Sequence, residues 1–175
     1  AVVAARDAAG GPLVPIESIE VETFGRALRL ANAVAPDTLE GAQYSLPFCV
    51  ALAALDGAAA LLPMRARCLR RPDVTALAAR VRMRVAPDLD AQFPGRVPAR
   101  VRIRAAGRVF ERTVANPLGD PDNPMSEDAL RAKFATLVPG DPAPLAEAAL
   151  GLGRTHGPAD LFAALADLRP AEPAA

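Results

Sequence analysis

The 175-residue chain has little of what most catalytic sites are made from. It contains one histidine (His156), one tyrosine (Tyr44), no tryptophan and two cysteines, Cys49 and Cys68. A metal site needs several imidazole, thiolate or carboxylate groups at set spacings, and none is visible, so we expect neither a metal nor a cofactor. A Ser-His-Asp arrangement would depend on His156, for which an exposed loop position is the simpler interpretation.

An excess of one charge and a long apolar run are also missing. The 20 basic and 20 acidic residues give a formal net charge of zero, which argues against a nucleic-acid or anionic-membrane partner. The apolar run of residues 46–55 is too short to cross a bilayer. The two cysteines have no C-x-x-C spacing, which predicts reduced thiols in a cytoplasmic protein.

About half of the residues are apolar, and the order of their patterns predicts an α+β fold. Residues 16–23 alternate apolar and polar side chains, as a half-buried strand does. Residues 24–35 indicate a short helix, and residues 39–44 are expected to be irregular. Ser45 is a plausible N-cap for a helix that runs to Leu55 and is apolar on nearly all sides, so we expect it to be buried.

Three further alternating runs predict the remaining strands of a small antiparallel sheet. Arginine alternates with valine, methionine or isoleucine over residues 80–85 and again over residues 100–104. Residues 109–114 return after a turn at Gly107, which predicts a hairpin. We expect helices to pack on this sheet and terminal helices to follow it.

The terminal helices are separated from the sheet by a turn-rich linker at residues 116–124. Ser126, Asp141 and Pro158 are expected to begin three of them. The chain is accordingly divided into the end of an upstream helix (1–12), an α+β domain (13–138), terminal helices (139–169) and a frayed tail (170–175).

The six arginines of the alternating runs are the first candidate site. At a period of two residues they share one face of a sheet, where a basic stripe would bind phosphate or carboxylate. A nucleic-acid surface would add stacking aromatics and net positive charge, and both are lacking. Glu20, Glu22 and Glu111 are available as cross-strand partners, so a solvated sheet face is the favoured interpretation.

Three segments in order carry longer motifs: E-G-A-Q-Y-S-L-P-F-C-V-A with D-G (40–51, 56–57), D-L-D with F-P and P-A-R-V (88–90, 93–94, 98–101), and G-D-P-D-N-P with K-F (119–124, 133–134). They resemble the E-A-Q-[FY]-S-L-P-Y-x-V-A…D-G, D-x-x-[FY]-P…V and G-D-P-x-N-P…K-F blocks of the MmgE/PrpD family, which includes 2-methylcitrate dehydratase. Three blocks in the right order are fairly specific, and the resemblance spans roughly residues 16–168.

The resemblance implies a small α+β lid domain beside a large helical domain, with the active site between them and the last helices returning to the helical domain. Family members dehydrate, decarboxylate or epimerise small di- and tricarboxylic acids without a metal, as in propionate metabolism. Their catalytic histidine, lysine and aspartate residues lie mostly in or just after the helical domain, which would precede Ala1. We therefore expect this chain to be inactive without that domain.

Four residues are candidates for the substrate cleft: Gln43, Tyr44, Ser45 and Phe48. A helix that begins at Ser45 would present free backbone N–H groups, which suit a carboxylate. Relatives often carry a tyrosine at the position of Phe48, and Tyr44 lies one turn earlier, where its side chain would face the same way. The alternative is that Tyr44 packs against the sheet with its hydroxyl at the surface.

Lys133 is the only lysine and a further candidate. It is either a functional cation near the apolar edge of its helix or a surface lysine whose stem lies along apolar surface.

Two functions are consistent with these observations. The first is the lid part of a metal-independent hydro-lyase or isomerase, whose substrate is a small carboxylic acid. The second is a non-enzymatic α+β module that binds a partner or a small acid. In either case the terminal helices need a cover, and we expect the helical domain or a second copy, in a homodimer, to provide it.

Overall fold

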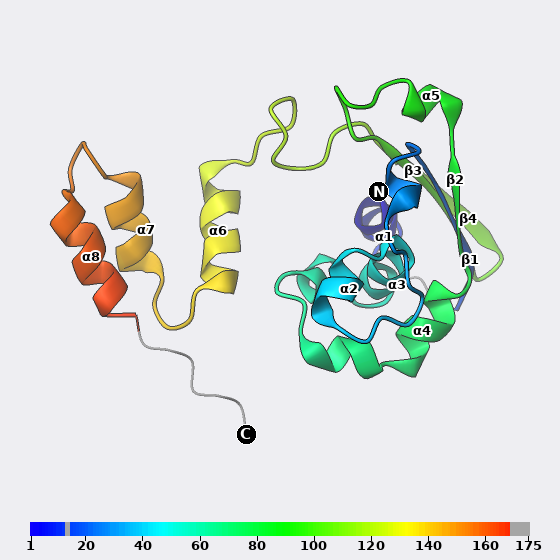
Figure 1. The fold of residues 1–175 in the computed structure, drawn as a ribbon, viewed down its shortest axis with the longest axis horizontal. Helices are drawn as coiled ribbons and strands as arrows, with labels where there is room; N and C mark the ends of the chain where they lie inside the picture. Colours follow the sequence, from blue (N-terminus) through cyan, green and yellow to red (C-terminus); the bar gives the residue numbers. More distant parts are fainter. Residues whose placement is uncertain (13–14, 169–175) are drawn as a thin grey trace. The chain divides into compact units, whose positions relative to one another are not determined.

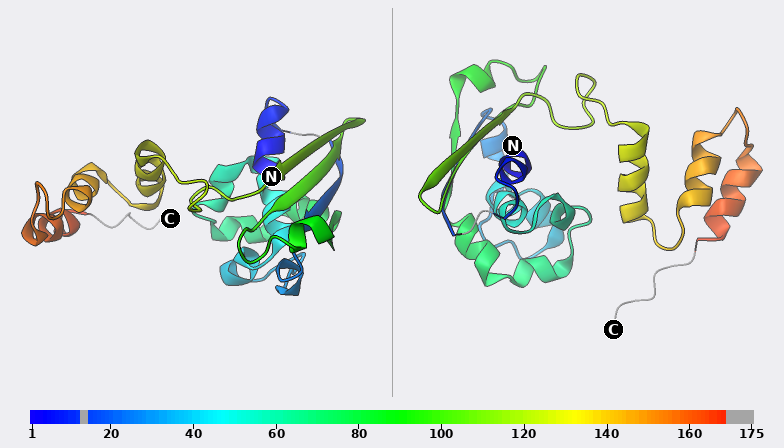
Figure 2. Two further views of the ribbon diagram at one scale, coloured as in Figure 1. Left: turned by 90° about the horizontal axis from the view of Figure 1, so that it is seen from above. Right: turned by 180° about the vertical axis from the view of Figure 1, so that it is seen from behind.

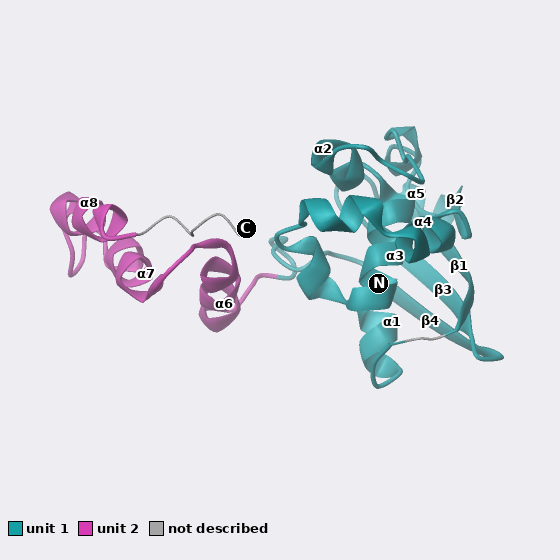
Figure 3. Cartoon of the chain, turned by 90° about the horizontal axis from the view of Figure 1, so that it is seen from below, with its two compact units in different colours: residues 1–123 teal, residues 124–175 magenta. Residues whose placement is uncertain are grey.

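The computed structural model describes residues 1–12 and 15–168 (Figure 1). The chain forms two compact units, unit 1 (residues 1–123) and unit 2 (residues 124–175), which Figure 3 distinguishes by colour. The frayed tail expected at residues 170–175 lies outside the described residues.

Unit 1 contains a four-stranded sheet in the order β2-β1-β3-β4. Its strands are β1 (Ile16–Thr23), β2 (Val81–Val85), β3 (Ala99–Ala105) and β4 (Arg108–Val114). The pairs β1–β3 and β3–β4 are antiparallel, and the latter is the hairpin expected at Gly107. The α+β fold is confirmed, with one difference: β2 runs parallel to β1, because helices carry the chain across between the two strands.

The remaining elements of unit 1 are the helices α1 (Val2–Ala8), α2 (Leu39–Gln43), α3 (Leu46–Asp56), α4 (Pro72–Ala78) and α5 (Pro87–Asp90), and the 3₁₀ turns η1 (Ala27–Arg29), η2 (Ala58–Leu61) and η3 (Ala66–Arg70). The helix expected over residues 24–35 is therefore reduced to η1. The irregular segment expected over residues 39–44 is wrong as well, since the Thr38 hydroxyl accepts a hydrogen bond from Gly41 N at 3.0 Å and begins α2.

The core of unit 1 lies between α3 and one face of the sheet. The helices α1, α2, α3 and α4 lie on one side of the sheet (Figures 1 and 2). Phe48 and Leu52 of α3 are fully buried against this core, together with Ile19 and Ile103 of the sheet. Each such side chain stabilises the fold by about 1.5–3 kcal/mol through burial, so α3 is the main support of the unit.

Unit 2 consists of α6 (Glu127–Leu137), α7 (Ala143–Leu150) and α8 (Pro158–Ala166). Ser126 caps α6 as expected, since its hydroxyl accepts a hydrogen bond from Ala129 N at 3.1 Å. Arg131 joins α6 to α7 by pairing with Glu147 at 2.7 Å. In the part of the chain that the structure describes, no helix is long and apolar enough to span a bilayer.

Candidate functional site

The segment from Gln43 to Phe48 joins α2 to α3 and turns on Ser45. The Ser45 side chain is fully buried; its hydroxyl donates to Ala33 O at 2.6 Å and accepts from Phe48 N at 3.2 Å. The expected N-cap is therefore confirmed. Because one hydroxyl joins the loop before α2 to the first turn of α3, the start of α3 is fixed in place.

The backbone donors at the start of α3 are all occupied or missing. Ser45 N donates to Ala42 O at 3.1 Å, and Leu46 N donates to Asn32 Oδ1 at 3.0 Å. Phe48 N uses the Ser45 hydroxyl, and Pro47 has no N–H. The free N–H groups expected here for a carboxylate are thus absent. The serine cap leaves only Leu46 N open, and the Asn32 side chain from the preceding loop accepts its hydrogen bond.

Asn32 holds this arrangement together. Its φ of 49° lies in the left-handed region, which asparagine tolerates better than most residues. Its side-chain amide donates to the carbonyls of Ala27, Leu28 and Leu30 at 3.2–3.4 Å. These bonds end the 3₁₀ turn η1 and replace the longer helix that the sequence pattern indicated.

The predicted cleft residues separate into an exposed pair and a buried pair. Gln43 is exposed, and Tyr44 is 55% exposed with no side-chain hydrogen bond among the described residues. Ser45 and Phe48 are fully buried. Tyr44 and Phe48 therefore differ in surroundings although they lie four residues apart, and only the first pair is accessible on unit 1.

Lys133 belongs to unit 2, where it is exposed on α6. His156 is half-buried in the same unit, and its Nδ1 lies 3.0 Å from the Thr155 hydroxyl. Among the described residues, no group of histidine, cysteine and acidic side chains is placed to hold a metal ion.

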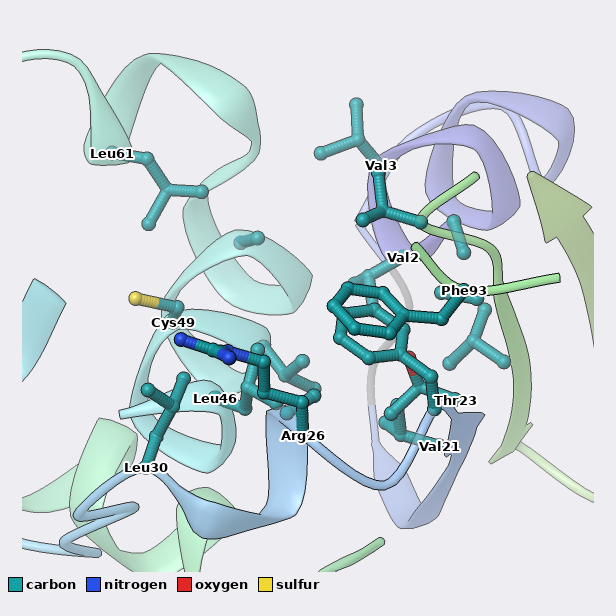
Figure 4. Close-up of a pocket in the computed structure, with 18 residues that line it drawn as sticks. Val2, Val3, Val21, Thr23, Arg26, Leu30, Leu46, Cys49, Leu61 and Phe93 are labelled. Atoms are coloured by element: carbon teal, nitrogen blue, oxygen red, sulfur yellow. The ribbon is translucent and has the colours of Figure 1, made fainter. Parts of the chain in front are cut away.

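An apolar pocket of about 590 Å³ lies in unit 1 and was not predicted from the sequence (Figure 4). One wall is a single face of α3, formed by Leu46, Cys49, Val50 and Ala53 at spacings of i, i+3, i+4 and i+7. The sequence signal was present, because α3 is apolar on nearly all sides: one face enters the core and the other lines this pocket.

The opposite side of the pocket is formed by α1 and by two stacked phenylalanines. The rings of Phe24 and Phe93 lie parallel, with their centroids 4.5 Å apart. Arg6 fixes α1 to α3, since its guanidinium donates to the carbonyls of Ala54 and Leu55. The α1 wall is therefore joined to α3 by hydrogen bonds, and the stacked rings form the rest of that side.

Arg26 is the one charged side chain that lines the pocket. In Figure 4 its guanidinium points toward Cys49, past Leu30 and Leu46. Among the described residues it makes no hydrogen bond or ion pair. The Cys49 thiol donates to Ala42 O at 3.3 Å, and burial raises the pKa of this thiol, so it stays uncharged at neutral pH.

The other face of the sheet carries paired charges, as the solvated-face interpretation predicted. Glu22 binds both Arg84 and Arg100, the latter at 2.6 Å. Arg102 binds Glu111 at 2.7 Å and lies 3.8 Å from Glu20. Because carboxylates neutralise this part of the arginine stripe, these arginines do not form a free anion-binding surface.

Comparison with known proteins identifies one family. The family model described as the MmgE/PrpD C-terminal domain matches residues 1–157. The match includes all of unit 1 and the segment of unit 2 up to Gly157. No curated protein matches the chain.

Proposed function

The chain belongs to the MmgE/PrpD family through its C-terminal domain, and on this premise we propose that unit 1 is the lid of a lyase or isomerase for small di- or tricarboxylic acids such as 2-methylcitrate. In this role the lid covers a substrate held by a helical domain and contributes polar groups to it. The chemistry requires a positioned acid and base, which the helical domain supplies.

The observation that carries the proposal is the exposed pair Gln43–Tyr44 at the start of α3. The pair lies within the longest family motif and is accessible, whereas its neighbours Ser45 and Phe48 are buried. Substrate-positioning groups must be held within a fraction of an ångström. The hydrogen bonds of Ser45 and Asn32 support the backbone at and next to Tyr44, since Asn32 N donates to Tyr44 O at 3.4 Å.

The carboxylate contact in this proposal comes from side chains. The backbone N–H groups at the start of α3 are already bonded, so the helix end offers only its positive dipole. The Tyr44 hydroxyl and the Gln43 amide are the donors that remain accessible in the segment. Each would add one hydrogen bond to a substrate oxygen.

Reconstitution tests the proposal. The purified chain alone is expected to turn over no 2-methylcitrate, and mixing or co-expressing it with a helical domain of the family is expected to give dehydratase or isomerase turnover. Heat-treated protein is the control. Turnover by the chain alone, or none in a complex that forms stoichiometrically, would contradict the assignment.

A non-enzymatic module is the second candidate, because the hydrophobic core of unit 1 is built entirely from its own residues, between Val2 and Ala105. Such a unit is able to fold and bind without a catalytic domain. If the chain is such a module, it should not associate with a helical domain of the family in the same mixing experiment.

A further inference from the structure

The pocket of unit 1 has the form of a site for an aliphatic chain. Its volume of about 590 Å³ falls within the range of roughly 300–1,000 Å³ that is usual for small-molecule sites. Leu46 of α3 lies across it from Val3 of α1 and Phe93 (Figure 4), and Val50 of α3 also lines it. An alkyl chain between these walls would replace water at apolar surface on both sides.

Among the polar side chains that line the pocket, one has free donors. The Thr23 hydroxyl already donates to Pro98 O at 3.0 Å, and the Cys49 thiol donates to Ala42 O at 3.3 Å. Arg26 has five N–H donors and, among the described residues, no partner for its side chain. Arg26 is an exposed residue at the edge of the pocket, and no acidic side chain lines the pocket to pair with it.

We propose that this pocket binds an aliphatic monocarboxylate of medium chain length. The alkyl chain lies along the α3 face between Leu46 and Ala53, and the carboxylate pairs with the Arg26 guanidinium. The planar fork of the Arg26 guanidinium suits one carboxylate, which it binds in a bidentate manner. This site is additional to the proposed lid function, and its binding is a property of the 175-residue chain alone.

Calorimetric titration of the full chain with hexanoate, octanoate and decanoate tests the proposal, with acetate and 1-octanol as comparison ligands. Each added methylene is expected to raise the affinity about fourfold, as burial of an alkyl chain predicts. Arg26→Gln is expected to weaken octanoate binding about tenfold and to leave 1-octanol binding unchanged.

Arg67→Gln is the matched control, because Arg67 is exposed on η3 and does not line the pocket. It should leave the octanoate affinity unchanged. Affinity that is independent of chain length, or an equal loss in the Arg26 and Arg67 variants, would overturn the proposal.

A second measurement places the ligand. Val50→Phe fills the pocket and is expected to abolish binding of octanoate and 1-octanol together, provided that circular dichroism shows a native fold. In a Cys68→Ala background, octanoate is also expected to slow alkylation of Cys49, which lines the pocket. Octanoate that binds without protecting Cys49 would place it elsewhere and refute the assignment, even if the Val50 variant does not fold.

Discussion

The backbone N–H of Leu46 donates to the side-chain oxygen of Asn32 at 3.0 Å, across fourteen positions of the chain. This bond connects the turn after β1 to the first residue of α3. It satisfies a helix-end donor that would otherwise be open. The amide nitrogen of the same side chain donates to the η1 carbonyls of Ala27 and Leu28. The accessible residues Gln43 and Tyr44 lie directly before this junction, which holds the backbone there, since Asn32 N donates to Tyr44 O at 3.4 Å.

The first prediction concerns Asn32 itself. Asn32→Ala removes the acceptor for Leu46 N, removes the side-chain donor to three carbonyls and keeps a φ of 49° that alanine disfavours. We expect the free energy of unfolding to fall by about 2–3 kcal/mol, measured by urea denaturation. Asn32→Gly loses the same hydrogen bonds but tolerates the backbone, so it should recover about 1 kcal/mol of that loss. Equal effects of the two substitutions would show that the φ angle contributes nothing.

Much of unit 1 could be predicted from local patterns. The period-two alternation of Glu20 and Glu22 against Arg100 and Arg102 follows from the pleat of a strand, and these residues do pair across β1 and β3. The N-cap at Ser45 is equally predictable from the sequence, because Ser45 directly precedes the helix that it begins.

What could not be predicted depends on partners distant in the sequence. The turn at Asn32 is stabilised in part by the distant Leu46 N, and no local pattern contains that information. The pocket also depends on tertiary packing. Because α3 is apolar on nearly all sides, only the fold decides which face packs on the sheet and which face lines the pocket near Arg26.

The second prediction is that Phe48 is a packing residue of unit 1. Its side chain is fully buried in the core, so Phe48→Ala should lower the free energy of unfolding by about 3–5 kcal/mol. Tyr44 is the single tyrosine and lies in unit 1, so its fluorescence reports the unfolding of this unit. Leu118→Ala is the control, since Leu118 is 63% exposed and its loss should change stability by less than about 0.5 kcal/mol.

The third prediction tests Tyr44 in the complex with the helical domain. If its hydroxyl contacts the substrate, Tyr44→Phe should reduce turnover about tenfold or more, equivalent to about 1.4 kcal/mol of barrier. Because Tyr44 is 55% exposed in this chain, the same change should alter the stability of the chain by less than about 0.5 kcal/mol. Unchanged kinetics would leave Tyr44 as a surface aromatic and would remove it from the cleft.

The fourth prediction concerns acid stability. Arg100 donates to Asp88 at 2.5 Å, and this hydrogen bond lowers the pKa of the Asp88 carboxyl below its usual value. A carboxyl whose pKa is lower in the folded state stabilises the fold above its unfolded pKa of about 4, and that contribution disappears as the pH falls through the folded value. Asp88→Asn should therefore flatten the dependence of unfolding free energy on pH below about pH 5.

The effect at Asp88 should be small and sensitive to salt, because the pair is exposed. Asp120→Asn is the control: it neutralises another carboxylate of unit 1, for which the described residues show no arginine partner. A pH profile that changes as much in the Asp120 variant as in the Asp88 variant would contradict the role of Arg100.

The last prediction is that the chain associates with itself through α8. Phe162 is 67% exposed and Leu165 is 45% exposed, three residues apart on this helix, so the two side chains form one apolar patch. Exposed apolar patches of this kind promote association, because contact removes them from water. We expect sedimentation velocity to show a sedimentation coefficient that rises with concentration, and Phe162→Asp to suppress that rise. Ala163→Asp adds the same charge one residue away and keeps the aromatic ring, so it should leave association intact. A wild-type chain that stays monomeric at high concentration, or equal losses in both variants, would show that Phe162 does not form the contact.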